Sequence, residues 1–279
     1  MILSNLTVSI VCYNSKPHLL AYTIHSLDIA AGNAKQARVL NYLELVLVDN
    51  GKGKKNSLED LVGKKVINCI NIDSIFLISG HGNIGYGRGH NLAIQRNQFD
   101  YHLVLNPDVL LAESSLVEAL LFLNQYPDLG LLAPFALDGE GNRLYLCKRF
   151  PTVFTLILRG FAPVWLKRIF VKKLEYYEMR DVIGDEVVWD IPIVSGCFML
   201  FRTKVLAKIN GFSPAFFLYF EDFDISLRMA KISRSAFVPS VRITHFGGHA
   251  SKKGWRHIIM FLGSAILFFN KHGWRWFNI

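Results

Sequence analysis

The chain has 279 residues, of which 51% are hydrophobic and 19% are charged. This length fits one catalytic domain with at most a small appendage, and the composition excludes an intrinsically disordered chain. The formal net charge of +9 indicates an anionic partner, and nucleic acid, a phosphorylated substrate and an acidic membrane surface are the three candidates.

Strands and helices alternate in the first 130 residues. Two runs rich in β-branched residues, 7–12 and 43–48, end in polar residues, as buried strands do. Between them a helix is expected at residues 17–31, with Ser15 as its cap and Pro17 in its first turn. The further expectations are a strand at 71–78, a glycine-rich loop at 79–89, a helix from about 90 to 98, a strand at 101–105, and a helix at 114–125 capped by Ser114 or Ser115. This alternation predicts an α/β fold with a mostly parallel, doubly wound sheet that binds ligands beyond the carboxyl ends of its strands.

The alternation weakens beyond Gly130. The expectations are a strand at 129–134, a turn at 138–141, an aromatic and basic segment to residue 180, a buried strand at 193–201, helices at 204–209 and 224–231, and a strand at 234–243. The four cysteines are scattered without a CxxC pair, which is typical of buried free thiols in a reducing compartment.

Targeting and membrane signals are sparse. The first residues lack the pattern of a signal peptide, so we expect a cytoplasmic protein. The longest near-apolar run, 258–269, is shorter than the roughly 20 residues that span a bilayer. Basic residues in 148–173 and 252–275 alternate with Phe, Leu, Ile and Trp, which suits peripheral contact with an anionic membrane better than a nucleic-acid groove. Packing of these segments against the core is the alternative.

Polar residues follow the first two predicted strands. Tyr13 and Asn14 come after the first strand, and Asp49 and Asn50 end the second. A carboxylate and an amide at adjacent strand ends can bind the edge of a pyrimidine base. Asp and Asn are also ordinary turn residues, and that alternative stays open.

The glycine-rich loop contains a formal match to the GxGxxG dinucleotide fingerprint at residues 80–85. The dinucleotide fingerprint requires a helix that begins directly after the match. Because the loop continues through Gly87 and Gly89, we expect no such helix here. We therefore interpret the glycines as allowing backbone to approach a ligand, with Arg88 available for phosphate. A nicotinamide-dependent oxidoreductase remains the competing hypothesis.

Three further motifs carry candidate chemistry. Asp108, in Asn106-Pro107-Asp108 after a hydrophobic strand, suits a divalent cation that is also held by a diphosphate, although an Asx turn explains the spacing equally well. Glu221 and Asp222 follow a hydrophobic stretch, and burial with like-charge neighbours raises carboxylate pKa values, which suits a general base. Asp224 in the same cluster fits simple helix-dipole stabilisation. His245 and His249 follow the last strand, where a histidine can complete a cation site.

Six segments in order resemble the family 2 glycosyltransferases, and most closely their bacterial rhamnosyltransferase-like branch. They are residues 8–14 (VSIVCYN), 47–50 (LVDN), 82–91 (GNIGYGRGHN), 105–108 (LNPD), 195–202 (SGCFMLFR) and 217–228 (FLYFEDFDISLR). The resemblance implies a GT-A fold, cytoplasmic use of a nucleotide sugar, and inversion at the anomeric carbon. It covers most of residues 8–250.

The resemblance also implies roles for single residues. Asp222 would be the catalytic base with Glu221 beside it. Asp108 would bind Mg²⁺ or Mn²⁺ in the motif usually written DxD, whose first position here is Asn106, with His245 or alternatively His249 as the late ligand. Asp49 would bind the base, and the remaining nucleotide-sugar-binding residues would be Tyr13, Asn14, Asn50, Asn83, Gly85, Arg88, Asn91, Asn106, Ser195 and Gly196.

The expected organisation is a GT-A domain over residues 1–250 and a basic amphipathic tail over 251–279. Within the domain, 1–130 would bind the nucleotide sugar and 131–250 would face the acceptor. The expected donor is dTDP-L-rhamnose, or else another dTDP- or UDP-sugar. The expected acceptor is a polyprenyl-diphosphate-linked glycan in O-antigen or cell-wall polysaccharide assembly, and no nucleic acid is expected. A noncatalytic basic adaptor is the third hypothesis.

Overall fold

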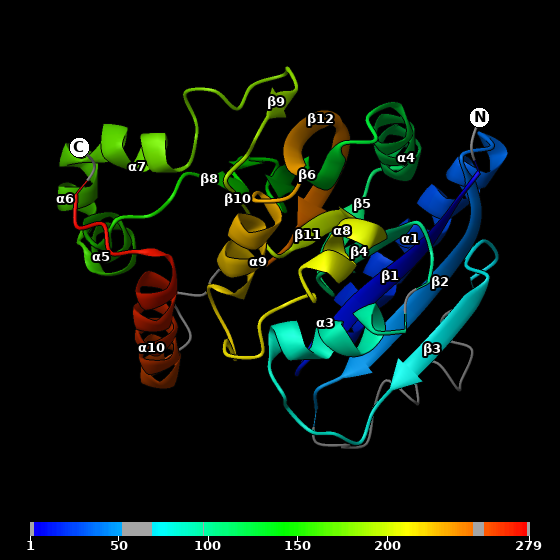
Figure 1. Ribbon diagram of the computed structural model, residues 1–279, viewed down its shortest axis with the longest axis horizontal. Helices are drawn as coiled ribbons and strands as arrows, with labels where there is room; N and C mark the ends of the chain where they lie inside the picture. Colours follow the sequence, from blue (N-terminus) through cyan, green and yellow to red (C-terminus); the bar gives the residue numbers. More distant parts are fainter. Residues whose placement is uncertain (1–2, 52–68, 97, 248–253, 278–279) are drawn as a thin grey trace.

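The structure is a computed structural model that describes residues 3–51, 69–96, 98–247 and 254–277 (Figure 1). The strands are β1 Ser4–Cys12, β2 Leu40–Asp49, β3 Ser74–Ile78, β4 Tyr101–Leu105, β5 Val109–Leu111, β6 Leu129–Asp138, β7 Arg143–Leu144, β8 Cys147–Lys148, β9 Val188–Trp189, β10 Ile193–Val194, β11 Phe198–Arg202 and β12 Arg234–His245. The helices are α1 Pro17–Gln36, α3 Tyr86–Ile94, α4 Ser115–Gln125, α5 Val153–Phe161, α6 Val164–Ile169, α7 Val171–Tyr177, α8 Thr203–Lys208, α9 Glu221–Met229 and α10 Gly254–His272.

One sheet forms the centre of the described part of the chain, in the order β3-β2-β1-β4-β11-β6-β12-β5. Neighbouring strands from β3 to β4 are parallel, and β6 is parallel to β12. Strand β11 is inserted antiparallel between β4 and β6, and β5 is antiparallel to β12. The expected mostly parallel α/β sheet is therefore confirmed, with β5, β11 and the short strands β7 and β9 at its side as the antiparallel members.

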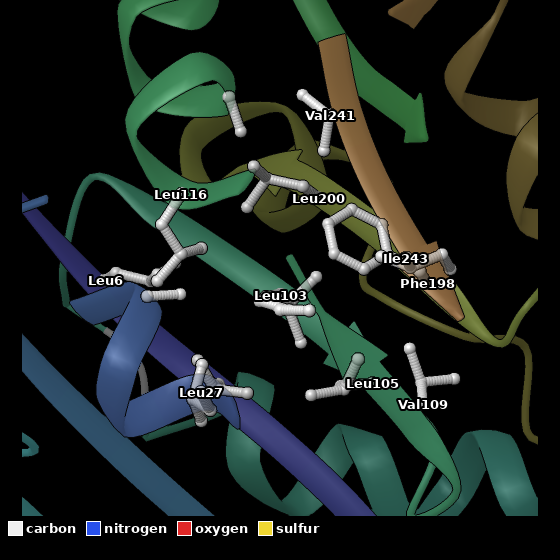
Figure 2. Packing of buried hydrophobic residues seen from close by; sticks show 14 of the residues in the cluster. Leu6, Leu27, Leu103, Leu105, Val109, Leu116, Phe198, Leu200, Val241 and Ile243 are labelled. Atoms are coloured by element: carbon white, nitrogen blue, oxygen red, sulfur yellow. The ribbon is translucent and has the colours of Figure 1, made fainter. Parts of the chain in front are cut away.

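The main core lies between the sheet and helices α1 and α4. Leu27 of α1 and Leu116 of α4 pack with Leu6, Leu103 and Leu200 of the sheet, all fully buried (Figure 2). Because side chains alternate along a strand, Val104 of β4 points to the opposite face, where it joins the cluster beneath α8 and α9. Both faces of β4 are buried, as its uninterrupted apolar sequence predicts.

The C-terminal segment is a helix that packs on the rest of the described chain with one face. Phe268 and Phe269 of α10 are buried against Phe216 and Phe220, whereas Trp255 and its neighbours on the helix remain exposed. Figure 1 places α10 and α5–α7 together at one end of the molecule. Core packing, one of the two alternatives for this segment, thus holds for one face of the helix, whereas membrane contact of the exposed face stays a prediction. None of the described helices is long and apolar enough to cross a membrane.

Several expected boundaries are wrong. The helix expected from about residue 90 begins at Tyr86, and the helix expected from 224 begins at Glu221. The strand expected over 193–201 is interrupted at residues 195–197, which separate β10 from β11. The N-cap residue of α1 is Lys16 rather than the expected Ser15. Ser114 does occupy the N-cap position of α4, as expected, although its side chain makes no capping hydrogen bond. Helix α1 does have proline in its first turn, as expected.

Candidate active site

The carboxyl ends of β1, β2 and β4 meet at one edge of the sheet. Asp49 ends β2 directly beside Cys12 of β1, and Asn14 adopts a left-handed conformation with φ of 51° that turns the chain after β1. The Asp49 carboxylate accepts a hydrogen bond from the Gly51 backbone N–H at 2.7 Å, and Tyr13 next to Asn14 is half-exposed. Asp49 and Tyr13 therefore border the place where a ligand of this sheet would lie.

Asn50 connects the sheet to the start of α3. Its backbone N–H donates to the carbonyl of Cys12, and its buried side-chain amide donates to the carbonyl of Gly85, both at 2.9 Å. Asn83 supports the same turn by accepting a hydrogen bond from the Gly85 N–H at 3.1 Å. These contacts fix the loop shape, while direct contact of either asparagine with a nucleotide stays a prediction.

The glycine-rich loop packs against residues 212–217. Gly85 has a φ of 92°, and a Cβ there would collide with the Phe217 carbonyl, so only glycine fits. The Asn91 side chain pairs with the backbone of Phe212, accepting from its N–H at 2.9 Å and donating to its carbonyl at 2.8 Å. The Arg88 guanidinium donates to the Pro214 carbonyl, with 2.8 Å for Nε. Arg88, expected to be available for phosphate, is thus engaged with backbone.

A helix does begin directly after the GxGxxG match, contrary to the sequence expectation. Gly87 and Gly89 lie inside this helix, α3, and their lack of side chains lets it pack closely on its neighbours. A Cβ at these positions would lie 2.9 Å from Phe212 and Val11 respectively. The backbone N–H of Tyr86 at this helix start donates to the Phe217 carbonyl at 3.0 Å. In a dinucleotide site such an N–H faces the pyrophosphate. Here the N–H of Tyr86 already donates to a backbone carbonyl, and this contact, rather than the absence of a helix, argues against the oxidoreductase hypothesis.

Asp108 and His245 come together because β5 pairs with β12. His245 lies opposite Val109, and its Nε2 is 3.3 Å from Asp108 Oδ1, a buried oxygen that accepts no hydrogen bond from the described residues. Gly247 borders the pair, since a Cβ there would lie 2.7 Å from His245 Nε2 and would collide with Asp108. A carboxylate oxygen and an imidazole nitrogen at this separation fit two ligands of one divalent cation.

His245 lies beside Asp108, whereas His249, the alternative ligand, lies outside the described residues. Within the described ranges there is no group of three or more His, Cys, Asp or Glu side chains able to hold a metal ion. A cation at Asp108 and His245 would therefore need further oxygen ligands, such as the phosphates of a substrate.

Asp222 lies at the start of α9 against the turn formed by residues 195–197. Its two carboxylate oxygens accept from the backbone N–H groups of Gly196 at 2.9 Å and Phe223 at 3.0 Å. The Tyr86 hydroxyl lies within hydrogen-bond distance of the Gly196 carbonyl, at 2.6 Å, and of Asn106 Oδ1, at 3.0 Å. Tyr86 thereby connects the loop before α3, the turn after β4 and the turn beside Asp222.

Burial determines the protonation of this acidic pair. Desolvation followed by the charge of Asp222 raises the pKa of Glu221 to about 8. Desolvation also raises the pKa of Asp222, although the N–H groups of Gly196 and Phe223 counteract it. The sequence-based expectation of raised carboxylate pKa values is confirmed in direction. A carboxylate in this state is suited to accept a proton from a hydroxyl.

Asp224 is different although it is only two residues away. Its buried carboxylate pairs with Arg228 at 2.8 Å, Lys271 at 2.7 Å and His272 at 2.9 Å, and so joins α9 to the end of α10. These contacts agree with the structural role expected for Asp224.

The acidic groups lie near one another around the turn at residues 195–197. The pKa of the buried Cys197 thiol is raised to about 12, first by desolvation and also by the charges of Asp108 and Asp222. Burial and the charges of Glu221 and Asp222 hold the pKa of Tyr86 well above its usual value, so its hydroxyl remains a neutral donor. Sequence reasoning missed Tyr86, and its only signal was a tyrosine directly after Gly85.

Known proteins resemble this chain in sequence and in fold. No protein-family profile matches the chain. In sequence it is 24% identical over 263 residues to an N-acetylglucosaminyl-diphospho-decaprenol L-rhamnosyltransferase of Mycobacterium tuberculosis, covering 88% of this chain and 77% of that protein. It is 25% identical over 208 residues to rhamnosyltransferase WbbL of Escherichia coli K12, covering 71% of this chain and 73% of the relative.

Solved structures share the fold. A mannosyltransferase from Pyrobaculum calidifontis, in complex with GDP-Man and Mn²⁺, matches with a TM-score of 0.59 at 17% identity over 95% of this chain and 65% of that one. GalNAc-T7 with UDP, GalNAc and Mn²⁺ matches with a TM-score of 0.59 at 15% identity over 88% and 43% of the two chains. This chain thus spans less than two thirds of each solved relative. Its fold is GT-A, and the resemblance to family 2 glycosyltransferases of the rhamnosyltransferase-like branch is confirmed.

Proposed function

We propose that this protein is a glycosyltransferase that moves a sugar from a nucleoside diphosphate donor to a hydroxyl group of a glycan acceptor. The observation that carries the proposal is the position of Asp222. This carboxylate with a raised pKa is oriented by Gly196 at a ligand-binding sheet edge that also holds Asp49 and Asp108. A base beside a nucleotide-binding edge is what sugar transfer to a hydroxyl requires.

The donor half of the site is assigned to the strand ends. Asp49 would bind the base of the nucleotide, and the first choice of donor is dTDP-L-rhamnose because both curated relatives are rhamnosyltransferases. Asp108 and His245 would hold Mg²⁺ or Mn²⁺, which would neutralise charge on the departing diphosphate. Two observations support this assignment: Asp108 Oδ1 has no hydrogen-bond partner among the described residues, and Gly247 lies so close to both side chains that a Cβ would collide with them.

The reaction proposed is a single displacement with inversion. Asp222 takes the proton of the acceptor hydroxyl while the hydroxyl oxygen attacks the anomeric carbon. The bond from that carbon to the nucleoside diphosphate breaks on the opposite side. Tyr86 and Asn106 hold the Gly196 turn in place, and the Gly196 N–H orients the carboxylate of Asp222. The protonated form of neighbouring Glu221 avoids a second negative charge beside the base.

The acceptor proposed is a glycan linked to a polyprenyl diphosphate, as in the name of the mycobacterial relative. The exposed apolar residues of α5, α6 and α10 support contact with a membrane surface that would present such a lipid. Among them Trp165, Ile169 and Trp255 are more than 60% exposed.

A nucleotide panel tests the proposed function. Addition of dTDP or UDP with Mn²⁺ is expected to raise the melting temperature, because a ligand that binds only the folded state stabilises it by mass action. Incubation with dTDP-L-rhamnose and acceptor should then release nucleotide. Stabilisation by NAD alone, without any effect of dTDP or UDP, would support an oxidoreductase instead and contradict the proposal.

The Gly247→Ala variant tests the cation pair. The added methyl group would enter the contact between Asp108 and His245, so we expect Mn²⁺ affinity in the presence of dTDP to fall about tenfold or more, measured by calorimetry. Gly263→Ala is the matched control, because a Cβ at this position in α10 meets nothing within 4 Å. Equal Mn²⁺ affinity in both variants would exclude Asp108 and His245 as the ligands.

A further inference from the structure

Three cations surround the carboxylate of Glu178 at the end of α7. Glu178 lies 3.9 Å from Lys148 Nζ, 3.8 Å from Arg159 Nε and 2.6 Å from Arg180 Nη2. Lys148 and Glu178 are largely buried, with side chains 7% and 16% exposed. Burial together with the charge of Arg159 lowers the pKa of Lys148 to about 8, although Glu178 counteracts them. This cluster carries more positive charge than its single carboxylate neutralises.

A hollow of about 260 Å³ opens beside this cluster, between α5, α6 and α7. Its cationic lining residues are Arg159, Lys167, Arg168 and Arg180, against the two carboxylates Glu175 and Glu178. None of the described carboxylates forms an ion pair with Lys167 or Arg168. A concave surface with unpaired basic groups favours an anionic ligand, and two nearby arginines favour one with several phosphate oxygens.

Arg159, which lines the hollow, also acts electrostatically on Asp222, the proposed base. Burial raises the pKa of Asp222, and the Arg159 guanidinium is close enough to counteract this effect. Arg159 and Asp222 both affect the buried phenol of Tyr177. Desolvation is the main cause that raises the pKa of Tyr177, the charge of Arg159 lowers it, and the charge of Asp222 raises it further. The charge of an anion held at Arg159 would therefore be felt at Asp222.

The lining is also partly apolar. Val164, Val171 and Leu174 face the same hollow, and exposed Trp165 and Ile169 lie on the adjoining helix α6. Figure 1 places α5–α7 beyond α9 from the strand ends of β1 and β2, so this anion site is separate from the donor edge. A ligand that fits has a multiply charged group followed by a hydrocarbon chain.

We propose that the hollow between α5, α6 and α7 binds the diphosphate of a lipid-linked acceptor, with Arg159, Lys167 and Arg168 on the phosphates and the first part of the lipid against Val164 and Leu174. This inference rests on the proposed function, and it adds the site that distinguishes a lipid diphosphate acceptor from a free sugar. The arginines offer paired N–H donors, which suit phosphate oxygens in a bidentate geometry.

Binding of a soluble probe tests the site directly. We expect the full chain to bind geranyl diphosphate more tightly than geranyl monophosphate, and geraniol least, in calorimetric titrations. Reversing two lining charges in the variant Lys167→Glu/Arg168→Glu should weaken geranyl diphosphate binding about tenfold or more. Lys204→Glu/Lys208→Glu is the matched control, because both lysines are exposed on α8 and outside the hollow.

A second variant keeps the test independent of large charge changes. Arg159→Gln preserves much of the side-chain length and is expected to weaken geranyl diphosphate binding, with a melting temperature close to that of the wild type. Unchanged geranyl diphosphate affinity in both this variant and Lys167→Glu/Arg168→Glu would overturn the proposal.

Phospholipid headgroups are the other source of lipid phosphate. Sedimentation with vesicles of phosphatidylcholine and phosphatidylglycerol distinguishes a site for phospholipid headgroups from a site for the acceptor diphosphate. Loss of vesicle binding in Lys167→Glu/Arg168→Glu with unchanged geranyl diphosphate affinity would overturn the proposal in favour of a headgroup site. Loss of geranyl diphosphate affinity with vesicle binding retained supports the acceptor site.

Transfer kinetics separate failure of this inference from failure of the proposed function. If both hold, the wild type has a lower KM for a diphosphate-linked acceptor than for the same sugar on a neutral alkyl chain, and Lys167→Glu/Arg168→Glu removes that difference. Equal KM values for both acceptors would contradict the inference alone. Absence of sugar transfer from every nucleotide sugar would contradict the proposed function, whereas geranyl diphosphate binding would still report on the hollow.

Discussion

Replacing Asp222 with asparagine is expected to lower the turnover number for sugar transfer by about 10²- to 10⁴-fold, the usual contribution of a positioned general base. Asparagine keeps the side-chain shape and can still accept a hydrogen bond from the Gly196 N–H, but it cannot take a proton from the acceptor hydroxyl. Nucleotide binding, which we propose to involve Asp49 and Asp108, should therefore be retained. Nucleotide release in steady-state assays and dTDP titration measure the two quantities separately.

The pH dependence gives a second measurement of the same variant. Because burial raises the pKa of Asp222 above its usual 3.8, wild-type activity is expected to rise with pH over a range above that value. The rise belongs to the Glu221 and Asp222 pair rather than to one residue. Asp185→Asn, at an exposed position away from the turn, is the control and should leave turnover unchanged. Near-normal turnover of Asp222→Asn would eliminate Asp222 as the base.

The Asp224→Asn variant is expected to lose about 3 kcal/mol of folding free energy, because removing one partner of a buried ion cluster leaves the other charges unpaired. The Asp224 side chain is completely buried and pairs with Arg228, Lys271 and His272. Urea denaturation measures the change. Asp222→Asn is the matched comparison, since the charged form of Asp222 is disfavoured by burial and its loss should not lower stability.

The sign of the pH effect on stability follows from the same contacts. Desolvation acts to raise the pKa of Asp224, but the pairing with Lys271, His272 and Arg228 outweighs it, and the folded-state pKa lies below 3.8. The stabilisation is therefore present above pH 3.8 and is lost as the pH falls through the folded-state value. Below that value the stability difference between wild type and Asp224→Asn should shrink. A difference that stays constant with acidification would contradict this account.

The sequence was sufficient for elements with a clear hydrophobic pattern. The strand expected at 101–105 is β4, and the polar residues expected at strand ends lie at one edge of the sheet. These successes share a cause, because a buried parallel strand is read from a local run of apolar residues. The acidic pair is a similar case, since the aromatic residues before Glu221 signalled its burial.

Tertiary contacts explain what the sequence did not reveal. Helix α3 contains glycines that local propensity disfavours, and close packing on Phe212 and Val11 overrides that preference. The apolar run at 193–201 gave no sign of the break at Gly196, whose backbone N–H is needed by Asp222. The proposed role of Arg159 depends on α5 sharing a buried cluster with α9, through Leu156 and Phe223, which a local pattern cannot predict.

The insertion of β11 has a consequence for how the protein folds. Leu200 of β11 pairs with Leu103 on one side and Leu132 on the other, so the centre of the sheet closes only after residues far along the chain have been synthesised. Such nonlocal pairing slows folding, and until it forms β4 presents an unpaired apolar edge that invites aggregation. The two halves of the chain, residues 1–130 and 131–250, which we expect to bind the nucleotide sugar and face the acceptor, should therefore fold as one cooperative unit. A fragment ending at residue 130 is expected to be insoluble rather than a minimal nucleotide-binding domain.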